Sequence, residues 1–120
     1  MRQLILVLGC FPFISISQNI DHWETVIFDN DTWKYLEGTY EPDSNWRKFS
    51  FNDSEWFEGQ GGIGYGDGDD NTEINPVTSL YLRKKFSIID ATEIEAAILH
   101  IDYDDAFVAY LNNVEIARSS

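Results

Sequence analysis

The feature that most constrains this chain is a set of short runs in which apolar and polar residues alternate, each bounded by turn-forming residues. The clearest run is the segment 80–88, where one set of alternate positions is mostly apolar and the other mostly polar. No stretch carries apolar residues at helical spacing for more than about one turn. Alternation of this kind is typical of antiparallel sheets with one buried face, so the sequence predicts an all-β fold with two sheets packed as a sandwich.

Turn chemistry divides the chain into candidate strands. The strongest signal is Asn112-Asn113, because asparagine tolerates the positive φ that a type I′ turn needs at both central residues, and we expect a tight hairpin there. A brief turn is expected at Asp90-Ala91-Thr92. The predicted strands are 25–28, 32–36, 80–88, 97–103, 107–111 and 114–118.

The segment 37–78 contains little regular strand and six glycines between Gly59 and Gly68. A low-complexity linker would explain the glycines, but linkers rarely interleave large aromatic residues such as Trp46 and Trp56. We therefore predict an ordered long loop in which glycine permits positive φ or a close approach of the backbone.

The N-terminal residues predict export. Residues 1–18 contain one basic residue, Arg2, and then an apolar run that ends near small residues, which is typical of a secretory signal peptide and too short for a membrane span. The alternative is a buried N-terminal strand. The single cysteine, Cys10, lies in this leader, and the alternative of lipid anchoring at Cys10 is disfavoured because the apolar run continues past it. We expect a domain over residues 19–120, secreted or at the cell surface, without a disulfide.

The charge balance limits the partners. The formal net charge is -13, and such an excess of carboxylates repels phosphate groups. Nucleic acid and anionic membranes are therefore excluded, whereas cations and neutral ligands are favoured. Aromatic residues make up 15% and hydrophobic residues 43% of the sequence, which supplies enough apolar surface for a core.

A more specific indication comes from several aromatic, glycine-rich and acidic blocks that follow one another in a fixed order. These blocks are Trp33-Lys34-Tyr35, Trp46, 51–56 (FNDSEW), 62–67 (GIGYGD), 81–86 (YLRKKF) and 103–118 (YDDAFVAYLNNVEIAR). Over about residues 26–118 the chain resembles the galactose-binding-like jelly-roll domain of large secreted bacterial proteins. Such domains accompany CotH-like kinase, lamin-tail, phosphoesterase and glycosidase modules. Ala106 and Asn113 depart from the family, which usually has glycine at these turn positions.

The resemblance implies a galactose-binding-like β-sandwich that serves a downstream module of the same polypeptide. A jelly roll uses about eight strands, and fewer are predicted before Ser120. We therefore expect the last strands to be lacking, and the segment 114–118 to present an apolar edge without a neighbour.

Aromatic side chains provide the candidate ligand site, because flat rings pack against the apolar C–H faces of sugars. The resemblance places Trp33, Trp46 and Trp56 in the framework of the domain, where they are expected to pack in its core. Aromatic residues outside that framework are freer to contact a ligand. The candidate carbohydrate-binding residues are Trp23, Tyr40 and Tyr65.

Asp67-Gly68-Asp69-Asp70-Asn71 places oxygen ligands on a turn, as a hard cation such as calcium requires. The spacing is not that of an EF-hand loop. The resemblance implies one structural calcium ion, and the alternative is a solvated acidic turn. The candidate calcium ligands are Asp67, Asp69, Asp70 and Asn71.

No motif predicts an enzyme, since the sequence lacks a serine motif, a P-loop and zinc-ligand spacing. Asp102, Asp104 and Asp105 allow a glycosidase reading, but a turn in which aspartate caps backbone N–H groups explains Asp104-Asp105 more simply. The only basic cluster, residues 83–85, is expected to pair with acidic strands rather than to bind an anion.

These observations predict a noncatalytic carbohydrate-binding-like accessory module of a larger secreted or cell-surface protein, with a glycan or polysaccharide as its partner. The alternative is a structural spacer or docking β-sandwich that has no small-molecule ligand.

Overall fold

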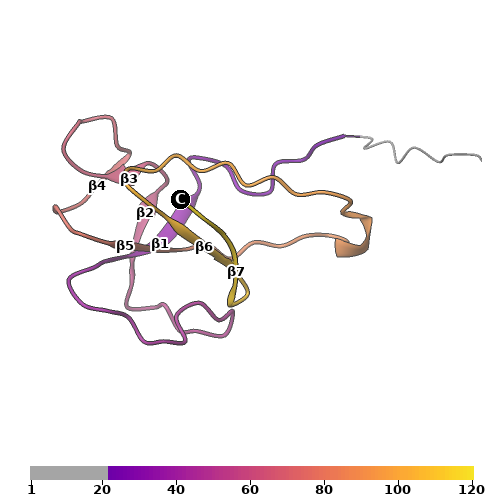
Figure 1. Cartoon of the computed structure of the whole chain (residues 1–120), viewed down its shortest axis with the longest axis horizontal. Coiled ribbons are helices and arrows are strands. Elements are labelled where there is room, and N and C mark those ends of the chain that lie inside the picture. The colour runs from indigo at the N-terminus through magenta and orange to yellow at the C-terminus, as the bar shows by residue number, and fades with distance from the viewer. Residues whose placement is uncertain (1–21) are drawn as a thin grey trace, which may run out of the picture.

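The computed structural model describes residues 22–120 (Figure 1). The predicted leader, residues 1–18 with Cys10, lies outside the described residues. No helix in residues 22–120 has the length and apolar character needed to cross a membrane. The elements are β1 (Thr32–Glu37), β2 (Phe57–Gln60), β3 (Ile63–Gly64), β4 (Thr72–Glu73), β5 (Leu80–Arg83), the 3₁₀ turn η1 (Ala91–Glu93), β6 (Val108–Leu111) and β7 (Val114–Arg118).

The central sheet is antiparallel and has the strand order β2–β1–β5. The β-branched and aromatic residues of β1, Thr-Trp-Lys-Tyr-Leu-Glu, favour a pleated strand. Tyr35 of β1 lies opposite Phe57 of β2 on one side and opposite Leu82 of β5 on the other. Because side chains alternate along a strand, these three share one face of the sheet, and Leu36 points to the opposite face.

Two smaller pairings complete the strands. β3 and β4 form a parallel pair of two residues each, within the glycine-rich segment. β6 and β7 form an antiparallel hairpin, in which Asn112 has a φ of 48° and Asn113 a φ of 71°. Both angles are positive, as a type I′ turn requires, so the predicted hairpin at Asn112-Asn113 is confirmed.

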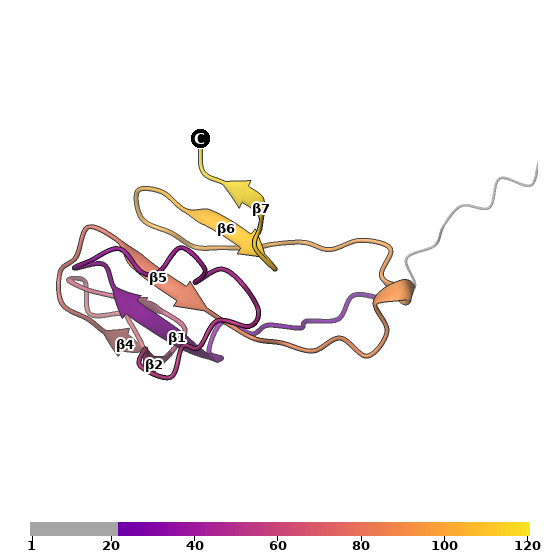
Figure 2. The same cartoon turned by 90° about the horizontal axis from the view of Figure 1, so that it is seen from below.

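A cluster of aromatic rings connects the hairpin to the central sheet, with Trp46 at its centre. The Trp46 ring centroid lies 6.1 Å from that of Trp56 and 5.4 Å from that of Tyr81. It lies 6.0 Å from the ring of Tyr110 in β6, with the two planes at 82°. Figure 2 shows the hairpin stacked beside the sheet on this side. The buried hydrophobic side chains of the described chain are Leu36, Trp56 and Ile74.

Arg83, at the end of β5, connects the segment before β2 to the central sheet through hydrogen bonds. Its Nε donates to the Asp53 carboxylate at 2.9 Å, and its Nη1 donates to the carbonyls of Trp46 and Lys48. The guanidinium also lies over the Phe51 ring, 5.1 Å from the ring centroid. Only 8% of the Arg83 side chain and 17% of the Asp53 side chain are exposed, so this ion pair is largely removed from water.

The predicted all-β class is confirmed, and strands were correctly predicted at 32–36, near 107–111 and at 114–118. The brief turn at Asp90-Ala91-Thr92 is also present, as η1 with Asp90 as its N-cap. The strands predicted at 25–28 and 97–103 are wrong, and the one at 80–88 ends at Arg83. These segments have the side-chain pattern of strands, but a strand also needs a hydrogen-bonding neighbour, and residues 22–120 provide none for them.

The glycine-rich segment is ordered as predicted, and its glycines divide between the two expected reasons. Gly62, Gly66 and Gly68 have positive φ. Gly61 serves the other purpose: a Cβ there would collide with the Asp29 carbonyl oxygen, and the Gly61 N–H donates to the Asp31 carbonyl at 2.9 Å. The segment is not wholly loop, however, because it contains β2, β3 and β4.

Candidate functional site

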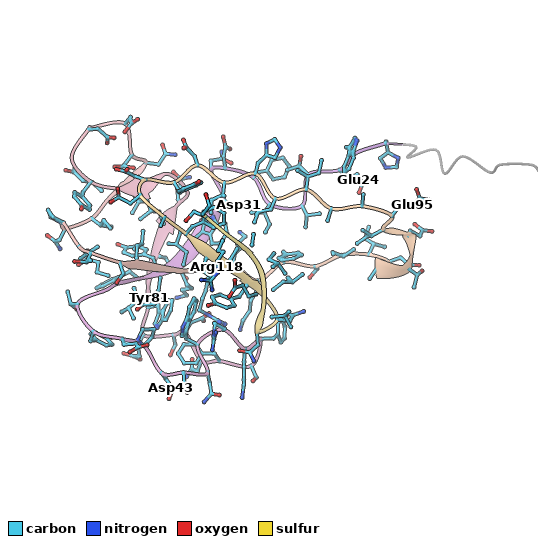
Figure 3. The ribbon with its side chains drawn as sticks, in the orientation of Figure 1. Glu24, Asp31, Asp43, Tyr81, Glu95 and Arg118 are labelled. Carbon is cyan, nitrogen blue, oxygen red and sulfur yellow. The ribbon has the colours of Figure 1, made fainter. Side chains whose placement is uncertain are left out.

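The three aromatic residues predicted to bind carbohydrate are all exposed but do not converge. The exposed fractions are 57% for Trp23, 63% for Tyr40 and 46% for Tyr65. Tyr65 directly follows β3, whereas Trp23 precedes Glu24, which Figure 3 shows at the end of the molecule away from Tyr81 and near Glu95. The Tyr65 hydroxyl donates to the Val77 carbonyl at 3.3 Å. Exposure therefore leaves each ring accessible, but Trp23 and Tyr65 do not form one binding surface.

The other three tryptophans are less exposed. Trp56 is buried, and Trp33 and Trp46 are half-buried. Trp46 and Trp56 belong to the aromatic cluster between sheet and hairpin. Their packing agrees with the structural role that the sequence predicts for them.

A set of apolar side chains that the sequence analysis did not single out lies side by side on the outer face of the central sheet. We call Phe57, Tyr35 and Leu82, which are direct neighbours across β2, β1 and β5, the Tyr35 row. The Phe57 and Tyr35 ring centroids are 5.5 Å apart, with the planes inclined by 33°. Phe57 is 59% exposed and Leu82 is 38% exposed. The row is thus a mainly apolar strip across three paired strands, with Phe57 and Leu82 exposed to water and Tyr35 half-buried between them.

Sequence reasoning missed the Tyr35 row because β2 was not predicted. Phe57 is followed by Glu58-Gly59-Gln60, which has little of the β-branched or aromatic character that marks a strand. Only the pairing of Tyr35 with Phe57 brings the two rings together. Tyr35 and Leu82 did carry a signal, because they lie in the predicted strands 32–36 and 80–88.

The predicted calcium ligands lie on an exposed loop between β3 and β4. The carboxylate oxygens of Asp67, Asp69 and Asp70 all lie within 4.8 Å of one another. The Asp70 carboxylate packs against Gly64, where an added Cβ would come within 2.6 Å of its oxygen. The fourth predicted ligand, Asn71, donates from its side-chain nitrogen to the Gly61 carbonyl at 2.7 Å, which fixes the end of the loop.

The electrostatics of this loop reflect crowded like charges. The hydrogen bond from Asp69 lowers the pKa of the Asp67 carboxyl below its ordinary value. The same hydrogen bond, together with repulsion from the Asp67 charge, raises the pKa of Asp69. Ionising both carboxyls is therefore unfavourable, and a bound cation would relieve their repulsion.

The basic cluster at residues 83–85 is engaged within the chain. Arg83 pairs with Asp53, and the Lys84 ammonium lies 3.4 Å from the Asp31 carboxylate. Lys85 lies over the Phe49 ring at 5.3 Å. The three basic residues line a pocket of about 220 Å³. Its other lining residues include Lys34 and Glu58, which pair at 2.9 Å. Arg83 and Lys84 therefore pair with carboxylates as predicted, but these partners, Asp53 and Asp31, lie in the loops before β2 and β1 and not in strands.

The aspartates considered for catalysis lie on an exposed turn. Asp105 has a φ of 65°, and the Ala106 N–H donates to the Asp104 carbonyl at 3.1 Å. Asp102 and Tyr103 precede this turn in an extended, exposed segment. The chain therefore turns at Asp104-Asp105 as expected, but through a bond between residues two apart, as in a γ-turn, and neither aspartate side chain caps an N–H group of the described residues.

The strands and their pairings define an all-β protein whose central sheet is antiparallel. The chain matches no known protein family, no curated protein and no solved structure. The galactose-binding-like resemblance therefore stays a prediction from the sequence.

Proposed function

We propose that this protein is a noncatalytic carbohydrate-binding accessory domain of the β-sandwich, jelly-roll type, and that it serves a larger secreted or cell-surface protein. The observation that carries the proposal is the Tyr35 row on the outer face of the central sheet. The net charge of -13 favours a neutral glycan over an anionic one. The proposed partners are thus a neutral polysaccharide and a further module of the same polypeptide.

The row suits carbohydrate for a physical reason. A pyranose ring has apolar C–H faces, which aromatic rings cover without requiring its hydroxyl groups to lose water. Phe57 and Tyr35 present two rings with centroids 5.5 Å apart, so one sugar residue can contact both. The rings are held by backbone pairing on both sides of β1, so binding would cost little conformational entropy.

The test is binding of the full chain to an array of neutral glycans, with Phe57→Ala as the variant. We expect saturable binding by the natural chain and an affinity at least about fivefold lower in Phe57→Ala, because stacking on an exposed ring contributes roughly 1 kcal/mol or more. Phe49→Ala is the matched control, since Phe49 is another exposed phenylalanine outside the row. Trp23→Ala, Tyr40→Ala and Tyr65→Ala test the sites predicted from the sequence. Equal binding by Phe57→Ala and the natural chain would exclude the Tyr35 row as the binding site. Absence of binding to every glycan on the array would favour the alternative function, a spacer or docking domain.

A structural calcium ion is the cofactor we propose. Calcium binds oxygen at about 2.3–2.6 Å, so two ligands of one ion lie at most about 5 Å apart. The carboxylate oxygens of Asp67, Asp69 and Asp70 meet this requirement. When bound, the ion would neutralise the repulsion within the loop and hold β3 and β4 together at its base.

Millimolar calcium is expected to raise the melting temperature of the full chain by about 5 °C, because an ion that binds only the folded state stabilises it. Asp69→Asn is expected to remove this rise, as is a chelator. Glu41→Gln removes the same charge from an exposed position outside the loop, and it should retain the rise. An undiminished rise in Asp69→Asn would show that calcium acts at another place.

The alternative function, a spacer or docking domain, has one observation in its favour. Every residue from 86 to 106 is exposed, and this stretch includes Ile98, Leu99 and Ile101. Such an apolar surface is typical of a region that contacts another polypeptide.

A further inference from the structure

The exposed arm, which we define as residues 86–106, runs out from the end of β5 and returns to β6. Figures 1 and 2 both show it as two long stretches joined by η1 at the far end. None of its residues is buried. A stretch of this length with no buried side chain gains nothing from the core of the described chain, although it carries large apolar residues.

The backbone N–H and carbonyl groups of residues 95–103 are available to pair with an added strand. No hydrogen bond within the described part of the chain involves residues 95–103. The side chains of this segment also line a shallow pocket of about 620 Å³. Its lining residues are Leu99, His100, Ile101, Asp102, Tyr103 and Phe107. The Tyr103 and Phe107 ring centroids lie 4.6 Å apart, so an aromatic pair forms part of the pocket lining.

The two sides of segment 95–103 differ in character. In an extended chain Leu99, Ile101 and Tyr103 share one side, and Ile98, His100 and Asp102 share the other, which is polar toward its C-terminal end. A strand added beside this segment would therefore place apolar residues next to the first side and polar or charged residues next to the second.

The negative charge of the arm favours a positively charged partner strand. The arm contains no lysine or arginine, and none of the ion pairs in residues 22–120 involves its carboxylates. A second copy of the chain would bring the same negative charges together, which is unfavourable. The acidic residues of the arm are Asp90, Glu93, Glu95, Asp102, Asp104 and Asp105.

We propose that segment 95–103 is a docking site for an extended peptide segment of another polypeptide in which apolar and basic residues alternate, and which binds as an added β-strand. Main-chain hydrogen bonds would provide affinity, and the alternation would fix the register and the face. The inference is independent of the proposed carbohydrate site, because none of the residues of the Tyr35 row belongs to the arm.

The test uses the full chain and a blocked synthetic peptide of alternating valine and lysine, of the same length as segment 95–103, measured by isothermal titration calorimetry. We expect saturable binding that weakens as salt is raised. A peptide of alternating valine and glutamate is expected to bind at least about tenfold more weakly, because like charges meet. Methylation of alternate backbone nitrogens in the valine–lysine peptide should also lower its affinity at least about tenfold, because the peptide then cannot donate backbone hydrogen bonds along one edge.

Variants of the chain locate the site. Asp102→Lys is expected to weaken binding of the valine–lysine peptide and to strengthen binding of the valine–glutamate peptide. Glu41→Lys makes the same charge change outside the arm and should alter neither affinity by more than about twofold. Far-ultraviolet circular dichroism confirms that each variant is folded. Absence of binding by the valine–lysine peptide, equal binding of both peptides, or full binding of the methylated peptide would each overturn the proposal.

Discussion

At the scale of single residues, Arg83 joins several parts of the described chain. One guanidinium joins the Asp53 carboxylate, two backbone carbonyls and the Phe51 ring, and thereby ties the segment before β2 to β5. Removing one partner of a buried ion pair leaves the other charged and without compensation. Arg83→Met is therefore expected to cost about 3 kcal/mol of unfolding free energy.

The Asp53 carboxyl makes this ion pair sensitive to acid. Burial raises the pKa of Asp53, but the hydrogen bond and charge of Arg83, with the charge of Lys85, outweigh it and leave the pKa below the ordinary value. A carboxyl with a lowered pKa in the folded state stabilises the fold above about pH 4 and loses that contribution as the pH falls through its folded pKa.

We therefore expect Asp53→Asn to be less stable than the natural chain by about 2 kcal/mol at neutral pH, and the difference to shrink below about pH 4. Urea unfolding followed by circular dichroism between about pH 2 and about pH 7, which spans the transition, measures both quantities. Glu41→Gln should follow the natural chain at every pH. A constant difference across the range would contradict the assigned role of Asp53.

At the scale of elements, the hairpin β6–β7 shows how a turn fixes a register. Asn112 and Asn113 both adopt positive φ, which sets Leu111 opposite Val114. Farther along, the register shifts between Ala109 and Tyr110, a β-bulge that lies next to the contact of Tyr110 with Trp46.

Substitutions at Asn113 test the turn. Asn113→Ala is expected to destabilise the chain by about 1 kcal/mol, because a side chain with a Cβ and no local hydrogen bond is strained at positive φ. Asn113→Gly is the matched variant and should be neutral or slightly stabilising, since glycine adopts this conformation freely. Thermal unfolding of both variants gives the comparison, and equal melting temperatures would show that the turn does not depend on this residue.

The same elements show what the sequence could predict. Asn112-Asn113 and the alternation in 80–83 and 114–118 act locally, so the hairpin and β5 were predictable. β2, β3 and β4 were not, because a strand of two to four residues with glycine, glutamate and glutamine has no pattern of its own and exists through its partner. The strand prediction for 97–103 was wrong for the opposite reason, because this segment has the pattern of a strand but the described chain provides no partner strand.

The candidate site divides in the same way. Asp67, Asp69 and Asp70 are close in sequence, and a short loop brings them together as expected. Trp23 and Tyr65 were grouped by residue type alone, and the chain separates them. The Tyr35 row depends on cross-strand register, which the sequence does not carry when one of the strands is unpredicted.

At the scale of the whole molecule, the stabilising contacts are unevenly distributed. The aromatic cluster, the central sheet and the Arg83 contacts lie together, whereas the exposed arm extends to one side (Figure 2). Local opening is easiest where few apolar contacts and few hydrogen bonds hold the backbone.

A glutamate-specific protease is therefore expected to cut the full chain at Glu93 and Glu95 before it cuts at Glu58. Glu58 is also exposed, but it lies in β2, pairs with Lys34 at 2.9 Å, and is held by the sheet. Mass spectrometry of early fragments measures the order of the cuts. Cleavage at Glu58 first would mean that the central sheet, and not the arm, opens most readily.

The unpaired backbone of segment 95–103 has a consequence for the chain in isolation. An apolar stretch with free N–H and carbonyl groups is the template from which cross-β fibrils grow. The carboxylates on both sides of it act as gatekeepers, because stacking identical copies would also stack their charges. Salt screens these charges and weakens this protection, so the purified protein is best stored at low salt.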